Sequence, residues 1–248
     1  MTWFEAVLLL VGGAFAGAVN AMAGGGSMLT VPLLDLAGVP GVAANGSNRV
    51  GILTSNISSL QSYRSEGVRI PGGLLAIMAP AIAGSLVGAY GISRLTDDTF
   101  RTVFGLIMIP LILLTIFKPK VKTQSERWPT GVTVAVFFCI GLYAGAIQAG
   151  VGLVLLAALS RSGFDLVTAN VVKVIFIFFA TCIALPVFIF NGDVRWGPAF
   201  LLAVGLTIGG WVGAKFAVRG GEKWIRIVMI IAAIALALNL LGFWDWLF

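Results

Sequence analysis

The organisation of this chain is decided by the stretch GAFAGAVNAMAGGGSMLTVP at residues 13–32. An apolar segment rich in small residues stops there at three consecutive glycines, 24–26, and a second apolar piece begins at Ser27. Because glycine weakens a helix interior and tolerates a left-handed backbone, the pattern predicts a helix, a break and a short second helix. A related stretch, GLYAGAIQAGVG at residues 141–152, predicts a second break.

The composition places these segments in a lipid bilayer. Of the 248 residues 59% are hydrophobic and only 10% are charged, and the mean hydropathy is +1.03. Because a soluble domain is about a quarter charged, these values exclude a soluble domain, a disordered chain and a secreted disulfide scaffold. The continuous apolar runs also argue against a β-barrel. The basic residues that give the net charge of +6 lie mostly between the apolar runs, so we expect them to set the membrane topology. We expect no nucleic-acid partner.

The remaining class is an all-α polytopic membrane protein. Runs of the length needed to cross a bilayer, about 20 residues, lie at 3–23, 42–63, 72–93, 100–117, 130–149, 167–190, 197–218 and 224–243. Two shorter apolar pieces, 28–39 and 153–159, follow the glycine breaks. The most polar segment lies near the middle of the chain. We therefore divide the chain into a first transmembrane repeat at 1–118, a basic connector at 119–129 and a second repeat at 130–248.

The two halves resemble each other in sequence. Residues 13–21 match 141–149 at an offset of 128, whereas Asn45 matches Asn170 at an offset of 125. The small-residue block 84–89 matches 209–214, again at 125. Nearly constant offsets indicate a duplication, which is the usual construction of secondary transporters.

The distribution of basic residues predicts how the repeats are oriented. If each glycine-broken segment crosses the bilayer once, the halves are parallel and the two sides carry seven and six basic residues. If each segment folds back as a hairpin, the halves are inverted and the split is ten to three. Because cytoplasmic loops carry the excess of Lys and Arg, we expect inverted repeats, each a broken hairpin plus three transmembrane helices. We therefore expect a multi-pass protein of the cell (inner) membrane, with a cytoplasmic connector and with both termini on the outer side.

Two cations lie deep inside apolar runs, where a charge is costly and marks a functional site by default. Arg49 and Lys173 each lie one turn after the matched residues Asn45 and Asn170, so each half contributes a cation at nearly the same position. Two explanations are open at this point. The cations bind a small anion, or they bind helix-end carbonyls and support the fold.

Amides and glycine breaks surround these cations in the sequence. A broken helix frees backbone N–H groups, and the helix that follows presents an N-terminus that attracts anions. Two breaks, two cations and several amides therefore predict one central site for a small anion. The expected binding residues are Arg49, Lys173, Asn45, Asn170, Asn20, Gln148, Asn48, Gly24, Gly25, Gly26, Ser27, Gly150 and Gly152. The serines that follow Asn48 on the same helix are expected to bond neighbouring helices.

The order of these features resembles the TauE/SafE family of sulfite exporter (DUF81) permeases. The resemblance rests on the pattern Gly24-Gly25-Gly26 followed by Pro32, preceded by a helix that contains Asn20 and followed by the Ala-Asn helix, all weakly repeated in the second half. The second half departs from it, because Gly150-Val151-Gly152 replaces the triple glycine and no proline follows at the matching place. The resemblance implies sulfite or organosulfonates as substrates, whereas the residues themselves indicate only a small anion.

We therefore expect a secondary transporter, and more specifically an exporter, of small sulfur-containing anions. A small-anion channel is the alternative. The chain has no histidine, so histidine-based catalysis and imidazole metal sites are excluded, and we expect no enzyme activity, no metal and no cofactor. Cys139 and Cys182 are expected to be free buried thiols. The substrate's identity, the coupling ion, a role for Asp35 and a homodimer remain open.

Overall fold

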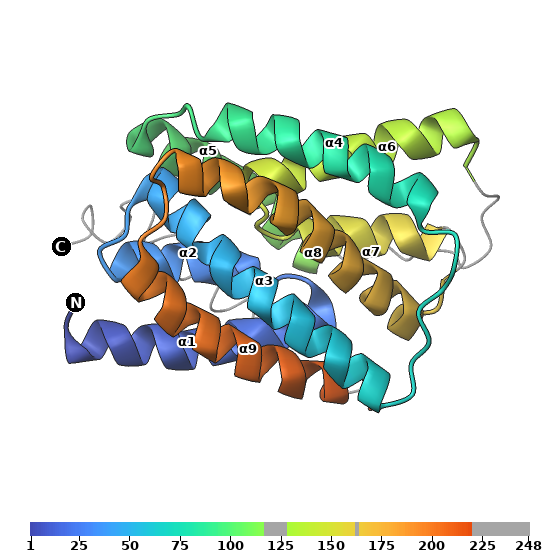
Figure 1. The fold of residues 1–248 in the computed structure, drawn as a ribbon, viewed down its shortest axis with the longest axis horizontal. Coiled ribbons are helices and arrows are strands. Elements are labelled where there is room, and N and C mark those ends of the chain that lie inside the picture. Colours follow the sequence, from blue (N-terminus) through green and yellow to red (C-terminus); the bar gives the residue numbers. More distant parts are fainter. Residues whose placement is uncertain (117–127, 162–163, 220–248) are drawn as a thin grey trace.

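The computed structural model describes residues 1–116, 128–161 and 164–219, and throughout these ranges it is helical with short connections (Figure 1). The helices are α1 (Trp3–Ala23), α2 (Ser27–Leu36), α3 (Gly41–Ser65), α4 (Leu75–Ile92), α5 (Asp97–Ile116), α6 (Thr130–Ala146), α7 (Val151–Arg161), α8 (Leu166–Phe190) and α9 (Trp196–Val218). Among the described helices, α1, α4, α8 and α9 are long and apolar enough to cross a membrane. The predicted all-helical membrane class is confirmed at this level.

Both predicted helix breaks are present. Helix α1 ends where Gly24 adopts a left-handed φ of 78°, and α2 begins three residues later at Ser27. Helix α6 ends at Ala146, three residues before the end of the predicted run, because the chain turns at Gln148 and Gly150 with φ of 63° and 64°. The predicted span at 224–243 and almost all of the predicted connector lie outside the described residues.

Glycines bring the helices into two close pairs. A Cβ atom on Gly13 of α1 would lie 3.0 Å from the carbonyl oxygen of Leu202 on α9, and one on Gly213 of α9 would lie 2.5 Å from Cα of Ala18. The same relation holds between α4 and α6, where a Cβ atom on Gly84 would lie 2.7 Å from the backbone nitrogen of Leu142. Such small-residue contacts are the usual means of packing helices in lipid, where no hydrophobic effect drives association.

These pairs also reveal the direction of the chain. Helix α1 runs parallel to α9, and α6 runs parallel to α4, as the order of the glycine contacts along each pair shows. Asn191 before α9 donates a hydrogen bond to Ser93 at the end of α4 (3.1 Å), so α4 and α9 run in opposite directions. It follows that α1 and α6, which open the two halves, are antiparallel, and Figure 1 shows them starting at opposite ends of the bundle.

Candidate functional site

The two helix breaks touch each other at the centre of the bundle. A Cβ atom placed on Gly152 would lie 2.5 Å from Cα of Gly24, so only glycine permits this approach of two backbones. The Ser27 hydroxyl donates to the carbonyl oxygen of Gln148 (3.0 Å) and accepts from the N–H group of Gly150 (3.2 Å). The contact brings four helix ends together. These are the C-terminal ends of α1 and α6 and the N-terminal ends of α2 and α7.

Arg49 of α3 binds the C-terminal end of α6. Its guanidinium donates from Nη1 to the carbonyl oxygen of Ala144 (3.1 Å) and from Nη2 to those of Gly145 and Ala146, the latter at 3.2 Å. Asn45, one turn earlier, donates from Nδ2 to the same Ala146 oxygen (2.7 Å). The guanidinium also lies 4.6 Å from the centre of the Phe188 ring. These carbonyls have no partner within α6, so a cation at this helix end is favourable.

Lys173 of α8 occupies the corresponding place at the C-terminal end of α1. Its Nζ donates to the carbonyl oxygens of Asn20 (2.8 Å) and Ala21 (3.1 Å) and to Oδ1 of Asn170 (2.7 Å). All three ammonium hydrogens therefore have partners. The Tyr63 hydroxyl donates to the Ala21 oxygen as well (2.9 Å). Each cation thus binds the broken helix of the other half of the chain.

The charges of this site are not balanced by acidic side chains. Arg49 and Lys173 are both fully buried, with 0% of their surface exposed, whereas no Asp or Glu residue is fully buried in the part of the chain that the structure describes. Asp193, before α9, is half-buried with its Oδ2 atom covered, and it makes no ion pair with either cation. Asp35, the acid nearest in sequence, lies at the end of α2 and pairs with Arg101 on α5 at 2.8 Å. The centre of the bundle therefore carries excess positive charge.

Several buried polar atoms near Arg49 have no hydrogen-bond partner. They include Arg49 Nε, Asn45 Oδ1, both atoms of the Asn48 amide and Oε1 of Gln148. Buried polar groups normally find partners, because an unmade hydrogen bond costs about 1–3 kcal/mol. Unpartnered donors and acceptors gathered within one turn of α3 and at the adjacent break therefore indicate a place for a ligand.

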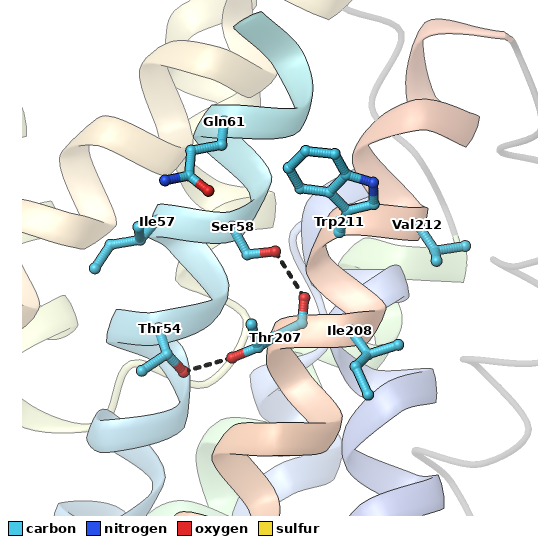
Figure 2. A pocket seen from close by; sticks show the side chains of 8 residues that line it. All are labelled: Thr54, Ile57, Ser58, Gln61, Thr207, Ile208, Trp211 and Val212. Carbon is cyan, nitrogen blue, oxygen red and sulfur yellow. Dashed lines mark hydrogen bonds between the residues drawn. The ribbon is translucent and has the colours of Figure 1, made fainter. Parts of the chain in front are cut away.

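The polar side chains in the C-terminal half of α3 have a different role, because they bond to α9. Ser58 donates to the carbonyl oxygen of Thr207 (2.7 Å), Ser59 to Gly210 (3.1 Å) and Ser62 to Trp211 (2.8 Å), all on α9. Figure 2 shows the outer edge of this contact, where an open groove is lined by residues of α3 and α9 and is crossed by the Ser58 bond and by a bond between Thr54 and Thr207. The expectation that the serines of this helix join neighbouring helices is confirmed for Ser59 and Ser62 but not for Ser55, whose buried hydroxyl has no partner.

Comparison with known proteins identifies the family of this chain. The sequence matches the family described as Sulfite exporter TauE/SafE over residues 9–240. The chain belongs to this family. It is 29% identical over 238 residues to the probable membrane transporter protein ORF9 of Sinorhizobium sp, covering 94% of this chain and 91% of that one.

Two further relatives extend this similarity. The TauE/SafE chain is 28% identical over 231 residues to the probable membrane transporter protein YfcA of Escherichia coli strain K12, covering 91% of this chain and 86% of the relative. It is 26% identical over 265 residues to the probable membrane transporter protein YunE of Bacillus subtilis strain 168, with coverage of 95% and 97%. No solved structure matches significantly. The chain is thus a multi-pass membrane protein of a transporter family.

The structure brings most of the predicted site residues of this TauE/SafE protein together. The two breaks meet, and Asn45, Arg49, Asn170 and Lys173 all lie against them. Asn20 contributes its backbone oxygen, and its side chain is buried against Gly26. The explanation that each cation binds helix-end carbonyls, left open above, describes the hydrogen bonds that Arg49 and Lys173 make here.

Sequence reasoning missed three contributors to the site. Thr181 accepts from Gln148 Nε2 at 2.6 Å, Tyr63 caps α1, and Phe188 stacks on Arg49. Helical spacing carries the signal for two of them, since Tyr63 lies five turns after Asn45 and Thr181 about two turns after Lys173 on the same faces. The stacking of Phe188 has no such signal, because its own helix α8 is apolar almost throughout.

Other predictions concern residues away from the site. Cys182 is half-buried, but Cys139 is exposed on α6, so its predicted burial is wrong. The reason is that an apolar run does not distinguish a side chain facing lipid from one facing protein. Among residues 1–116, 128–161 and 164–219, no group of three or more His, Cys, Asp and Glu side chains is arranged to hold a metal ion.

Proposed function

We propose that this protein is a secondary transporter that exports small sulfur-containing anions, such as sulfite or organosulfonates, across the cytoplasmic membrane. The observation that carries the proposal is the pair of fully buried cations, Arg49 and Lys173, neither of which bonds to a carboxylate among the described residues. A buried charge is stable only with compensation, and helix-end carbonyls compensate each cation only in part. An anion at the meeting point of the two breaks supplies the rest.

The helix dipoles also favour a negatively charged ligand. The C-terminal ends of α1 and α6, which would attract cations, are each bound by a full positive charge. The N-terminal ends of α2 and α7 meet at the same place without an acidic side chain in their first turns. Because a helix N-terminus attracts anions, the net field at the contact favours negative charge.

The proposed binding groups are the donors that the fold leaves without partners. Arg49 Nε and the Asn48 amide can donate to an oxyanion while the remaining Arg49 nitrogens hold α6. Lys173 contributes through its charge, since its three hydrogens are already donated. The backbone N–H groups of Gly24 and Gly150 are already donated, to carbonyl oxygens of α1 and to the Ser27 hydroxyl, so the breaks contribute through the N-terminal ends of α2 and α7.

The proposed architecture is a pair of inverted repeats with the substrate between them. It is supported by the antiparallel directions of α1 and α6, and by the way Arg49 and Lys173 bind the hairpins of opposite halves. In this arrangement the connector is cytoplasmic and both termini lie outside. An inside-negative potential of 100 mV favours the exit of each anionic charge by about 2.3 kcal/mol, so export needs no coupled ion.

The contact between the breaks favours a carrier over the alternative channel. Gly24 and Gly152 touch through their backbones, and Ser27 bonds across the same contact. A channel needs a continuous path in its conducting state, whereas a carrier needs a central barrier that opens to one side at a time.

Transport in liposomes tests this proposal. Purified protein is reconstituted, vesicles are loaded with sulfite, sulfoacetate, taurine, sulfate or thiosulfate, and efflux is followed with an imposed inside-negative potential. We expect saturable efflux of at least one sulfur anion, reduced in an Arg49→Gln protein that inserts normally. Efflux no faster than from protein-free vesicles for every anion would overturn the proposal. Efflux that does not saturate would identify the channel.

A further inference from the structure

Two amide side chains at the proposed site have a fixed orientation, so the position of each amide oxygen is known. Asn45 must direct its Nδ2 group to the carbonyl oxygen of Ala146 (2.7 Å), because a carbonyl cannot donate, so its Oδ1 is fixed on the other side. Oδ1 is buried and has no partner. The orientation of this amide therefore follows from its surroundings.

Gln148 is fixed by the same logic. Its Nε2 lies 2.6 Å from Oγ1 of Thr181. The Thr181 hydroxyl donates its hydrogen to the carbonyl oxygen of Ile177, also at 2.6 Å. Thr181 must therefore accept from Gln148, so Oε1 of Gln148 is the free atom. Oε1 is buried and without a partner, and the side chain is 1% exposed. Gln148 also has a φ of 63°, the only positive φ of a non-glycine residue in the described chain. Such backbone strain is typical of functional sites.

The two free acceptors belong to one place in the fold. Asn45 binds the carbonyl oxygen of Ala146, and Gln148 follows Ala146 by two residues at the break. The unpartnered donors, Arg49 Nε and the Asn48 amide, lie within one turn of Asn45 on α3. A ligand that satisfies all these groups must accept hydrogen bonds and also donate them.

A metal cation could bind the free oxygens, but it would add positive charge to a site that already holds two buried cations. Arg49 already binds the Ala146 oxygen that Asn45 shares, at 3.2 Å, and neither buried cation bonds to a carboxylate in the described ranges. A third positive charge at this place is unfavourable, whereas a hydroxyl or N–H group on the substrate carries the needed hydrogen without adding net charge to an anion.

We infer that the substrate is a singly charged oxyanion that also carries a hydrogen-bond donor, rather than a bare anion. Hydroxysulfonates, aminosulfonates and the protonated forms of diprotic oxyacids belong to this class. Asn48 and Arg49 bind the anionic oxygens, and the fixed oxygens of Asn45 and Gln148 receive the donor. This inference rests on the proposed function, because it specifies the anion that the same site binds.

A matched pair of probes tests it. The anions 2-hydroxyethanesulfonate and 1-propanesulfonate have the same charge and size and differ by a hydroxyl in place of a methyl group. Calorimetric titration of the purified protein in sodium-free buffer should give about 10-fold or tighter binding of the hydroxy compound, because the methyl group leaves buried acceptors unpaired. Gln148→Met should reduce that ratio to about 2-fold or less. Ser62→Ala, which removes only a bond to α9, should preserve it.

The outcomes separate the two proposals. Equal affinities for the two probes in the wild-type protein overturn the inference and leave the anion transporter standing. Binding that requires added sodium also overturns it, because a cation then occupies the acceptors. No binding of either probe or of sulfite overturns both. A folded Gln148→Met protein that keeps the full ratio removes Gln148 from the assignment.

Discussion

The ammonium nitrogen of Lys173 lies 2.8 Å from the carbonyl oxygen of Asn20, a residue 153 positions earlier in the chain. Arg49 makes the reverse connection, from the first half to the carbonyl oxygen of Ala144 in the second, at 3.1 Å. Each half thus holds the broken helix of the other. A movement of one half against the other must stretch or break these bonds.

Arg49 should contribute to anion affinity through the geometry of its guanidinium group as well as through its charge. Arg49→Lys keeps the charge but loses the planar fork that spans several carbonyls, so binding should weaken. Arg49→Gln also loses a charge-assisted bond of about 1.5–3 kcal/mol, which corresponds to about 10–100-fold weaker binding. Calorimetric titration of sulfite into each folded variant measures both. Wild-type affinity in Arg49→Gln would remove Arg49 from the site.

Lys173 should tolerate arginine better than glutamine. Lys173→Gln removes the charge that binds the end of α1 and leaves carbonyl oxygens of Asn20 and Ala21 short of a donor. We expect a lower melting temperature together with weaker anion binding, whereas a purely structural role predicts a lower melting temperature with unchanged affinity in the protein that remains folded. Thermal unfolding with and without substrate distinguishes the two, because a bound ligand stabilises only a protein that binds it.

The contact between the breaks should require glycine. In Gly152→Ala the new Cβ atom would lie 2.5 Å from Cα of Gly24, so the two backbones must separate. We expect transport to be lost while membrane insertion is kept. Gly91→Ala is the matched control, since a Cβ atom there meets nothing within 4 Å. Transport at the control's rate in Gly152→Ala would show that the close approach is dispensable.

Asp165 should stabilise the start of α8 in a pH-dependent way. Its carboxylate accepts hydrogen bonds from the N–H groups of Val167 and Thr168, both at 3.0 Å, and the Thr168 bonds hold the pKa of Asp165 below its ordinary value of 3.8. A depressed pKa contributes stability that is present above pH 4 and is lost as the pH falls through the folded-state pKa. Asp165→Ala should therefore cost about 1 kcal/mol at neutral pH and progressively less below pH 4.

Denaturant unfolding of the purified protein over a pH series measures this difference. Asp165→Asn keeps a capping oxygen without a titrating charge, so its stability relative to Asp165→Ala should not vary with pH. A pH-independent difference between the wild type and Asp165→Asn would contradict the assignment.

The topology can be tested by labelling. In a variant without Cys139 and Cys182, Thr2→Cys should react with a membrane-impermeant thiol reagent added outside intact cells. Glu66→Cys, in the loop after α3, should react only after the membrane is permeabilised, because the inverted arrangement places that loop in the cytoplasm. Labelling of both positions from the same side would contradict the arrangement.

The sequence by itself determined the membrane class, the two helix breaks and the identity of the two buried cations. It could do so because each is a local property. Apolar runs need only be counted, glycines at 24–26 and 150–152 stop a helix wherever it packs, and a charge inside an apolar run is costly in any membrane fold. The small-residue blocks that match between the halves also became the close helix contacts of α1 with α9 and of α4 with α6.

Only the tertiary structure decided what the cations bind. From the sequence, Arg49 and Lys173 converge on an anion or bind helix ends, and nothing local separates these possibilities. The structure shows Arg49 on the end of α6 and Lys173 on the end of α1, contacts that join residues about a hundred or more positions apart. These contacts also fix the orientation of the Asn45 and Gln148 amides, whose oxygens have no partner. Hydrogen bonds between the halves depend on how the whole bundle packs, and this packing is set by contacts between distant segments rather than by the sequence of any one segment.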